Sequence, residues 1–242
     1  MIAAVTTRTA ALLIVGDEIL NGEVEDRNSG LLTRGLWSAG VEIERALWLR
    51  DRPETITRAV SEARAAADLV FVCGGIGPTH DDCTRAAVAA ALGVPLERHP
   101  EAEARLRHAY GGRLAAADLE MADLPRGARL LVGPRSGGFG FQVESVVVLP
   151  GVPEFLADIL EPIWSDLRGP ARYRRELISA CGEGRLAPLL REVQGRFPDV
   201  SIGSYPTLLD GRFRVRLVLR SIDPVRLQAA TQALEAGLAA LG

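Results

Sequence analysis

Over the first two-thirds of the chain, two patterns of hydrophobic and polar positions alternate: short apolar runs and segments with helical spacing. Short apolar runs indicate strands at residues 11–15, 41–49 and 69–73. The intervening segments, and the segment after residue 150, have helical spacing, with helices predicted over 29–39, 51–67, 85–92 and 153–167. Because strands that alternate with helices are typical of parallel βαβ units, this pattern predicts an α/β fold with a mostly parallel sheet.

Several predicted helices carry local end signals. Asn28 and Asp51 each stand where an N-cap is expected, and Glu54 follows Asp51 at the spacing of a capping-box partner. Gly40 and Gly93 are placed to end the helices that precede them. These residues set the predicted helix boundaries.

The middle of the chain is less regular. Residues 94–128 are helical in composition but are interrupted by Gly111-Gly112 and Pro125. Strands are predicted on both sides of the turn-rich segment that follows, at 129–132 and 141–149. A second strand-to-helix turn, Leu149–Pro153, has its proline at the first helical position. Ligands in open α/β sheets bind outside the carboxyl ends of strands, so this turn and the one after residue 73 are expected to face one crevice.

A change of rhythm marks a boundary near Arg168-Gly169-Pro170 and gives two predicted domains, 1–168 and 169–242. The second domain has the order βαββα, with elements predicted at 174–181, 185–196, 200–207, 213–220 and 224–240. Asp210-Gly211 supplies the turn of an antiparallel hairpin. This order predicts a small α+β domain. The domain contains no catalytic cluster, so a structural or dimerising role is expected ahead of a role in gating substrate.

The composition narrows the class of protein. Hydrophobic residues make up 48% and charged residues 24% of the 242 positions, which is typical of a soluble globular protein. The formal net charge of −3 argues against a sequence-independent nucleic-acid binder. The apolar run at residues 10–15 is too short for a membrane span or a signal peptide, so a cytoplasmic location is expected.

The basic and sulfur-bearing residues exclude several chemistries. All 28 Lys and Arg residues are arginine, which excludes Schiff-base formation, pyridoxal phosphate attachment and a P-loop lysine. Cys73, Cys83 and Cys181 have no Cys-x-x-Cys spacing, so neither a disulfide framework nor a zinc site is predicted. A nucleophilic role for Cys83, which lies beside the glycine-rich segment described next, is a minor alternative.

The strongest chemical signal is the glycine-rich segment Gly74–Gly77 between a buried strand and a helix. Glycines at such a turn let backbone N–H groups approach an anion, and the helix N-terminus favours negative charge. Of the two acidic residues at this end, Asp81 and Asp82, one suits an N-cap and the other suits a Mg²⁺ ion that bridges protein and phosphate. The alternative is an ordinary βα turn with a capping aspartate. His80 occupies the position of the third glycine of a Rossmann fingerprint, which excludes that motif.

Three ordered motifs resemble the molybdopterin-binding domain family. They are Gly16-Asp17-Glu18-Ile19-Leu20-Asn21-Gly22, the segment from Gly74 to Arg85, and Leu149-Pro150-Gly151-Val152-Pro153. The resemblance covers about residues 10–167, and the nearest group is similar to the N-terminal part of competence/damage-inducible protein A. It implies a three-layer α/β/α sandwich followed by a small α+β domain. The deamidase domain that many members carry next is not found in this sequence, so deamidation is not expected.

The resemblance also implies roles for individual residues. Asp82 matches the carboxylate that ends the family's glycine loop and is expected in catalysis and metal binding. Asp51 is expected either as a second catalytic acid or only as a helix N-cap. Asp17 and Glu18 are expected to bind metal or the heterocycle. Phosphate contacts are expected from the backbone of Gly74, Gly75, Gly77 and Gly151, the hydroxyls of Thr79, Thr84 and Ser136, and the guanidinium groups of Arg85 and Arg135.

The resemblance leaves three functions open. The first expectation is metal-dependent hydrolysis of a nucleotide pyrophosphate of the ADP-ribose or FAD type, with Mg²⁺ or another divalent cation. The alternatives are non-catalytic binding of a pterin or nucleotide, and a step of molybdopterin cofactor synthesis. Residues 117–127 are acidic where typical members have a basic run, which favours the non-catalytic alternative.

The resemblance also bears on partners. The expected ligand is a small phosphorylated heterocycle, and molybdopterin is one such ligand. Neither a nucleic acid nor a membrane is expected as a partner. The family's habit of self-association implies a homodimer or homotrimer.

Overall fold

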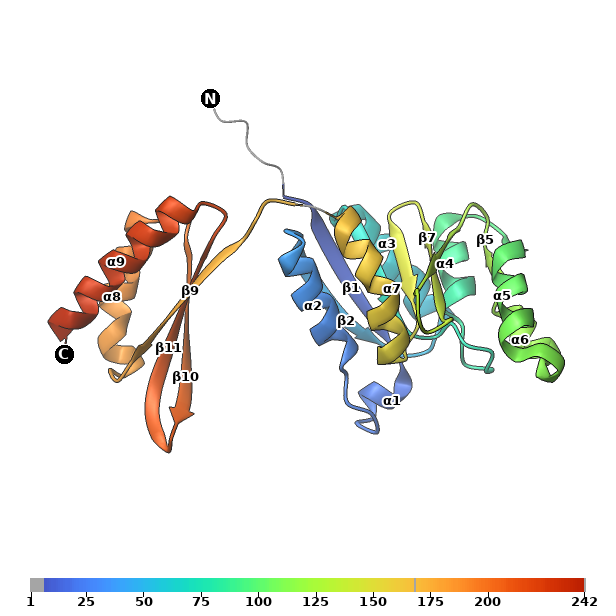
Figure 1. The fold of residues 1–242 in the computed structure, drawn as a ribbon, viewed down its shortest axis with the longest axis horizontal. Coiled ribbons are helices and arrows are strands. Elements are labelled where there is room, and N and C mark those ends of the chain that lie inside the picture. Colours follow the sequence, from blue (N-terminus) through green and yellow to red (C-terminus); the bar gives the residue numbers. More distant parts are fainter. Residues whose placement is uncertain (1–6, 168, 242) are drawn as a thin grey trace, which may run out of the picture. The chain divides into compact units, whose positions relative to one another are not determined.

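A computed structural model describes residues 7–167 and 169–241 (Figure 1). The chain divides between Gly169 and Pro170 into two compact units, which are described separately. The predicted boundary included Arg168, which lies outside the described residues.

The first unit is built on a six-stranded sheet with the order β2-β1-β3-β8-β7-β6. Its strands are β1 (Thr9–Val15), β2 (Glu42–Leu49), β3 (Leu69–Cys73), β6 (Arg129–Val132), β7 (Phe139–Val143) and β8 (Val146–Leu149). The first four strands in the sheet order are parallel, and β7 and β6 are antiparallel to their neighbours. Every residue of β3 and β8 is buried, as expected for central strands covered on both faces.

Alternate residues of β1 enter two separate cores, which confirms the three-layer fold. Ala11, Leu13 and Val15 pack with α3 (Pro53–Ala66), α4 (Thr84–Leu92) and α5 (Pro100–Tyr110). Ala10, Leu12 and Ile14 pack with α2 (Asn28–Ser38) and α7 (Pro153–Asp166). Figure 1 shows α2 and α7 on one face of the sheet and α3 and α4 on the other.

The prediction for residues 94–128 missed a small sheet. Its strands, β4 (Leu96–Arg98) and β5 (Asp123–Pro125), pair antiparallel and enclose α5. Two short helices, η1 (Gly111–Arg113) and α6 (Ala116–Glu120), complete this segment, and a further one, α1 (Asp17–Leu20), follows β1. Each strand of the pair has three residues, too few to give a readable period-two pattern.

The single strand predicted over 141–149 is a hairpin, β7 and β8. The chain reverses at Glu144, a non-glycine residue with φ +50°. The Glu144 carboxylate forms an ion pair with Arg64 of α3. Neither Glu144 nor Ser145 is a strong turn signal in the sequence, so the continuous apolar run hid the reversal.

The second unit has the predicted order βαββα. Its elements are β9 (Tyr173–Ser179), α8 (Glu183–Arg196), β10 (Ser201–Leu209), β11 (Arg212–Ser221) and α9 (Pro224–Leu241). The three strands form an antiparallel sheet with the order β10-β11-β9. Both helices lie on one face of this sheet (Figure 1) and share a core with it that includes Leu186, Leu217 and Leu234.

Across the described part of the chain, no helix combines the length and the apolar character needed to cross a membrane.

Candidate functional site

A cavity of about 740 Å³ lies in the first unit at the carboxyl ends of β1, β3 and β8. Its lining includes the turns that follow these strands, at Gly16, Gly74 and Gly151. Two of these turns lie close together, because a Cβ on Gly151 would lie 3.5 Å from the Cα of Gly74. The volume falls in the range of small-molecule sites, and the position is the one expected for a ligand of an open α/β sheet.

The glycine-rich turn after β3 is shaped by close backbone packing. Gly74 has φ +107°, and a Cβ there would overlap the carbonyl oxygen of Val15 in β1. Gly75 has φ +68°, and its carbonyl accepts a hydrogen bond of 2.9 Å from the N–H of Thr84, where α4 begins. Only glycine tolerates both the positive φ and the close approach at Gly74. The turn therefore lies directly against β1 and the start of α4.

The two aspartates of this turn do not cap α4. The N-cap residue is Cys83, whose side chain makes no capping bond. The Asp82 carboxylate instead accepts hydrogen bonds from the N–H of Thr79, at 2.9 Å, and from the Thr79 hydroxyl. A Cβ on Gly77 would lie 2.6 Å from Asp82 Oδ2, so this carboxylate lies against the glycine turn. The capping prediction for this pair was wrong, and Asp82 and Asp81 both line the cavity.

Asp51 also lines the cavity instead of capping its helix. The N-cap of α3 is Arg52, and Asp51 Oδ2 accepts a hydrogen bond of 2.8 Å from the N–H of Asp17. Asp17 Oδ1 accepts one of 3.2 Å from the N–H of Asp51, so the two residues are bonded reciprocally. The predicted N-cap and its capping-box partner Glu54 were wrong, because the side chain of Asp51 turns to the strand-to-helix turn after β1.

Burial and like charges disfavour ionisation of Asp51. Desolvation is the largest cause of its raised pKa, and the neighbouring carboxylates of Glu18, Asp17 and Asp81 raise the pKa further, while the N–H of Asp17 opposes them. Glu18 and Asp51 both line the cavity, whereas Asp17 does not lie among the described lining residues and is 3.5 Å from Arg50. The cavity therefore has an acidic side, where a cation would relieve the repulsion between the carboxylates of Asp51, Glu18 and Asp81.

This acidic side fits a cation only when a ligand supplies further oxygens. Within residues 7–167 and 169–241, no group of three or more His, Cys, Asp or Glu side chains could hold a metal ion. Mg²⁺, however, is commonly held by one or two carboxylates together with phosphate oxygens. Asp51 and Asp82 meet that weaker requirement, since both line the cavity beside the glycine turn.

Thr84 and Arg85 lie behind the glycine turn. The Thr84 side chain is fully buried, and its hydroxyl has no hydrogen-bond partner among the described residues. The Arg85 guanidinium is also buried and donates to the carbonyl oxygens of Gly77, at 3.2 Å, and Glu120. Burial lowers the pKa of Arg85, and nearby carboxylates, including Asp82, oppose the shift. Both side chains support the turn from behind and are absent from the described cavity lining, where phosphate contacts were expected.

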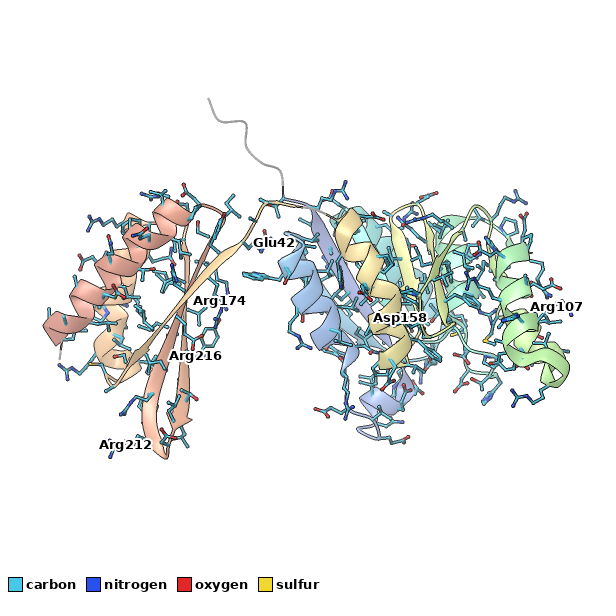
Figure 2. The ribbon with its side chains drawn as sticks, in the orientation of Figure 1. Glu42, Arg107, Asp158, Arg174, Arg212 and Arg216 are labelled. Atoms are coloured by element: carbon cyan, nitrogen blue, oxygen red, sulfur yellow. The ribbon has the colours of Figure 1, made fainter. Side chains whose placement is uncertain are left out.

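The segment between β6 and β7 forms another part of the lining. Its Ser136, Gly137 and Gly138 line the cavity, together with Phe139 at the start of β7. Arg135 was predicted to contact phosphate, but its guanidinium pairs with Asp158 and Glu161 of α7 and does not belong to the described lining. Asp158, labelled on α7 in Figure 2, is 4% exposed.

The cysteines offer no activated thiol at this site. Burial raises the pKa of Cys73 to about 12, and its thiol donates to the carbonyl of Pro150 at 3.3 Å. Desolvation, with the nearby Asp51 carboxylate, also raises the pKa of Cys83. A nucleophilic cysteine needs a lowered pKa, so the structure does not favour that minor alternative.

Several lining residues were given other roles by sequence reasoning or were missed. Asn28 was predicted as an N-cap, but its amide nitrogen donates to the carbonyl of Gly151 at 2.6 Å, and Asp26 accepts the hydrogen bond from Ser29 N–H instead. Arg27, Arg105, Tyr110, Phe139 and Phe155 also line the cavity. These residues come from elements far apart in the sequence, so no local motif marked them. For Phe155, one signal was available: an aromatic residue two positions after the Leu149–Pro153 turn, in the first turn of its helix.

Comparison with known proteins gives two family matches. Residues 11–168 match the family model described as "Probable molybdopterin binding domain", and residues 171–241 match the model of "FAD synthase, middle domain".

Individual relatives match different shares of the chain. A protein of Pyrobaculum calidifontis is 34% identical over 215 residues, or 84% of this chain and 82% of that protein. A CinA-like protein of Citrifermentans bemidjiense is 36% identical over 203 residues, which is 79% of this chain. The match spans only 48% of that relative's length. The crystal structure of the protein CinA, of unknown function, from Thermoplasma acidophilum matches with TM-score 0.62 and 30% identity, covering 66% of this chain and 98% of the other.

Proposed function

The chain belongs to the molybdopterin-binding domain family, and on that premise we propose that its first unit hydrolyses the pyrophosphate of an ADP-ribose- or FAD-type nucleotide with a divalent cation. The resemblance to CinA-like proteins, confirmed by the relatives, supports a ligand that combines phosphate with a heterocycle. The match of the second unit to the FAD synthase middle domain is consistent with a nucleotide of this kind.

One observation carries the proposal: the cavity brings together three features that a pyrophosphate site requires. The glycine turn presents backbone close to the start of α4, where N–H groups favour an anion. Asp51 and Asp82 line the same cavity beside that turn. An apolar part of the lining, with Phe139 and Phe155, suits a heterocycle.

Each group of cavity residues has a distinct role in the proposed hydrolysis. Backbone N–H groups of Gly74–Gly77 bind and orient the phosphates. Asp51 and Asp82 would hold the divalent cation, which when bound neutralises phosphate charge and polarises the phosphoryl group. Water attacks one phosphorus atom, the bond from that phosphorus to the bridging oxygen breaks, and two monophosphates result. Where Asp82 holds the cation, the Asp51 carboxylate takes the proton from the attacking water.

A non-catalytic binding role is the second candidate, and a specific observation favours it. The guanidinium groups of Arg85 and Arg135 are occupied by protein oxygens. Among the described residues, the arginines that line the cavity are Arg27 and Arg105, and Arg105 is bonded to Glu101. Arginine side chains would therefore contribute little to stabilising the charge that develops on the phosphoryl group during hydrolysis, whereas binding alone does not require that stabilisation.

The experiment is an AMP-release assay with ADP-ribose and, separately, FAD as substrates. We expect AMP with Mg²⁺, Mn²⁺ or Co²⁺, and none after chelation. Asp82→Asn is expected to keep the fold and lose at least about 100-fold of the rate, as for other charge-stabilising groups. Asp81→Asn is the matched control at the adjacent position and is expected to retain most activity.

The same assay separates the candidates. Metal-independent rates, or wild-type turnover by Asp82→Asn, would contradict the hydrolytic role. Ligand-induced thermal stabilisation without product would support the binding role instead.

A further inference from the structure

The cavity contains large apolar side chains that remain exposed. Phe155 is 38% exposed and Val152 is 46% exposed, and both line the cavity at the start of α7. Phe139, at the start of β7, lines it as well. Exposed apolar surface that is gathered in a cavity, rather than scattered, marks a place where a ligand buries its own apolar part.

Phe155 lies directly against the backbone of a neighbouring turn. A Cβ placed on Gly138 would lie 2.9 Å from Phe155 Cγ and 3.2 Å from its Cδ2. No larger residue at position 138 could keep this arrangement without displacing the ring. The glycine therefore allows the backbone to support the ring in the lining of the cavity.

The turn that supports Phe155 is itself fixed from α7. The carboxylate of Asp158 accepts hydrogen bonds from the N–H groups of Arg135, at 3.0 Å, and Ser136, at 2.7 Å. Ser136 Oγ then accepts a hydrogen bond of 3.3 Å from the N–H of Gly138. Phe155 and Asp158 are three residues apart on one helix, so α7 holds both the ring and the turn behind it.

We propose that Phe155 is the stacking platform for the planar heterocycle of the ligand. This inference rests on the proposed function, because it assumes that the phosphates bind at the glycine turn. The ring is supported before the ligand arrives, which reduces the conformational entropy lost on binding. Stacking accepts any planar heterocycle, so the platform suits a pterin and an adenine alike.

The test is titration calorimetry of the full chain with three probes in the presence of Mg²⁺: AMP, 6-hydroxymethylpterin and ribose 5-phosphate. Phe155→Leu is expected to weaken binding of AMP, of the pterin, or of both by about 5- to 100-fold, the range for loss of one aromatic stack. Ribose 5-phosphate has no heterocycle, so its affinity is expected to stay the same. Loss confined to AMP would identify adenine as the base, and loss confined to the pterin would identify the pterin.

Three further variants serve as controls for the stacking role of Phe155. Phe155→Tyr keeps the ring and is expected to retain wild-type affinity. Gly138→Ala keeps phenylalanine at position 155 but displaces its ring, so it is expected to weaken binding of the same heterocyclic probes as Phe155→Leu does. Phe213→Leu, an aromatic residue of the second unit that is 49% exposed, is expected to change nothing.

The outcomes distinguish a failure of the proposed function from a failure of the stacking role alone. If the wild type binds none of the three probes but releases AMP from ADP-ribose, only this inference fails; if it neither binds a probe nor releases AMP, the proposed function fails as well. If the wild type binds AMP or the pterin and Phe155→Leu binds them equally well, only the stacking role is wrong. Equal weakening of all three probes would also overturn it, since that result indicates a general loss of the site.

Discussion

Asp51 shows how one residue can serve the site at the expense of the fold. Its carboxylate accepts a hydrogen bond from the backbone N–H of Asp17, and the Asp17 carboxylate accepts one from the N–H of Asp51. The pKa of Asp51 is raised by desolvation and by the charges of Glu18, Asp17 and Asp81. A folded-state pKa above the unfolded value of 3.8 means that the folded protein loses stability as the pH rises through the interval between the two values. At neutral pH, the ionised Asp51 is therefore destabilising.

Asp51→Asn is accordingly expected to stabilise the first unit while impairing its activity. Asparagine keeps an oxygen that can accept the Asp17 N–H and removes the charge. Because the site is partly exposed, we expect a rise in melting temperature of only about 1–3 °C at pH 7, together with loss of metal-dependent turnover. Calorimetry at pH 4 and pH 7 checks the sign: the advantage of the variant should shrink at the lower pH. A variant less stable than wild type at pH 7 would contradict this account of Asp51.

Sequence reasoning at the level of residues found the glycine turn but not the partners of its neighbours. Gly74 and Gly75 were identified because positive φ and close backbone approach require glycine, which can be recognised in the sequence itself. Asp51, and one of the pair Asp81 and Asp82, were predicted as caps because they stand next to helix starts, while Asp82 was also expected in catalysis and metal binding. The donor to Asp51 lies 34 positions away in sequence, which local spacing does not encode. Asp82 instead accepts from Thr79, three residues before it, so its contact is local but is not a helix cap.

The connection between α7 and the segment before β7 depends mainly on Asp158. Burial opposes ionisation of its carboxyl, but the N–H groups of Ser136 and Arg135 outweigh that effect and hold the pKa at about 2. A carboxyl with a lowered pKa contributes stability that is fully present above its unfolded value of 3.8 and is lost as the pH falls toward 2.

Asp158→Asn is expected to lower the melting temperature at pH 7 and to flatten its decline between pH 4 and pH 2. The asparagine oxygen can still accept from the N–H groups of Arg135 and Ser136, but its NH₂ group faces the Arg135 guanidinium and the ion pair is lost. Glu161→Gln is the matched control, because it removes the exposed second carboxylate that pairs with Arg135. Its expected effect on the melting temperature is small, as for surface ion pairs in general. Equal effects of the two substitutions would show that Asp158 is not the main connection.

The predicted elements were most accurate where each element carried its own period and end signals. Helix α4 ends at Gly93, in the left-handed conformation, as the sequence indicated. The β7–β8 hairpin and the β4–β5 pair were missed for opposite reasons. The former is a continuous apolar run that reverses at Glu144, and the latter is two short strands separated in sequence by α5, η1 and α6. Both depend on contacts that a local window does not contain.

The molecule as a whole has separate hydrophobic cores in its two units. Two cores cover the faces of the first sheet, and a third, with Leu217 fully buried, belongs to the second unit. Units with separate cores unfold as separate cooperative transitions. The division predicted from the change of rhythm in the sequence and the division of the structure differ by a single residue.

Differential scanning calorimetry is therefore expected to resolve two transitions. An ADP-ribose analogue with a methylene bridge, which the protein cannot hydrolyse, is added with Mg²⁺ at about 100 times its dissociation constant and should raise only the transition of the first unit, by about 5–10 °C. Leu217→Ala should lower or abolish only the other transition, since such core truncations cost about 2–5 kcal/mol. A ligand-induced shift of both transitions, or of the transition sensitive to Leu217→Ala, would place the site elsewhere.

The most direct measurement is a crystal structure of the full chain with Mg²⁺ and an ADP-ribose analogue whose bridging oxygen is replaced by methylene. The account predicts phosphate oxygens within hydrogen-bond distance of the backbone N–H groups of Gly74–Gly77. It also predicts a cation between those oxygens and Asp51 or Asp82, and the adenine ring against Phe155. A ligand bound outside this cavity, or phosphates placed away from the glycine turn, would contradict the account.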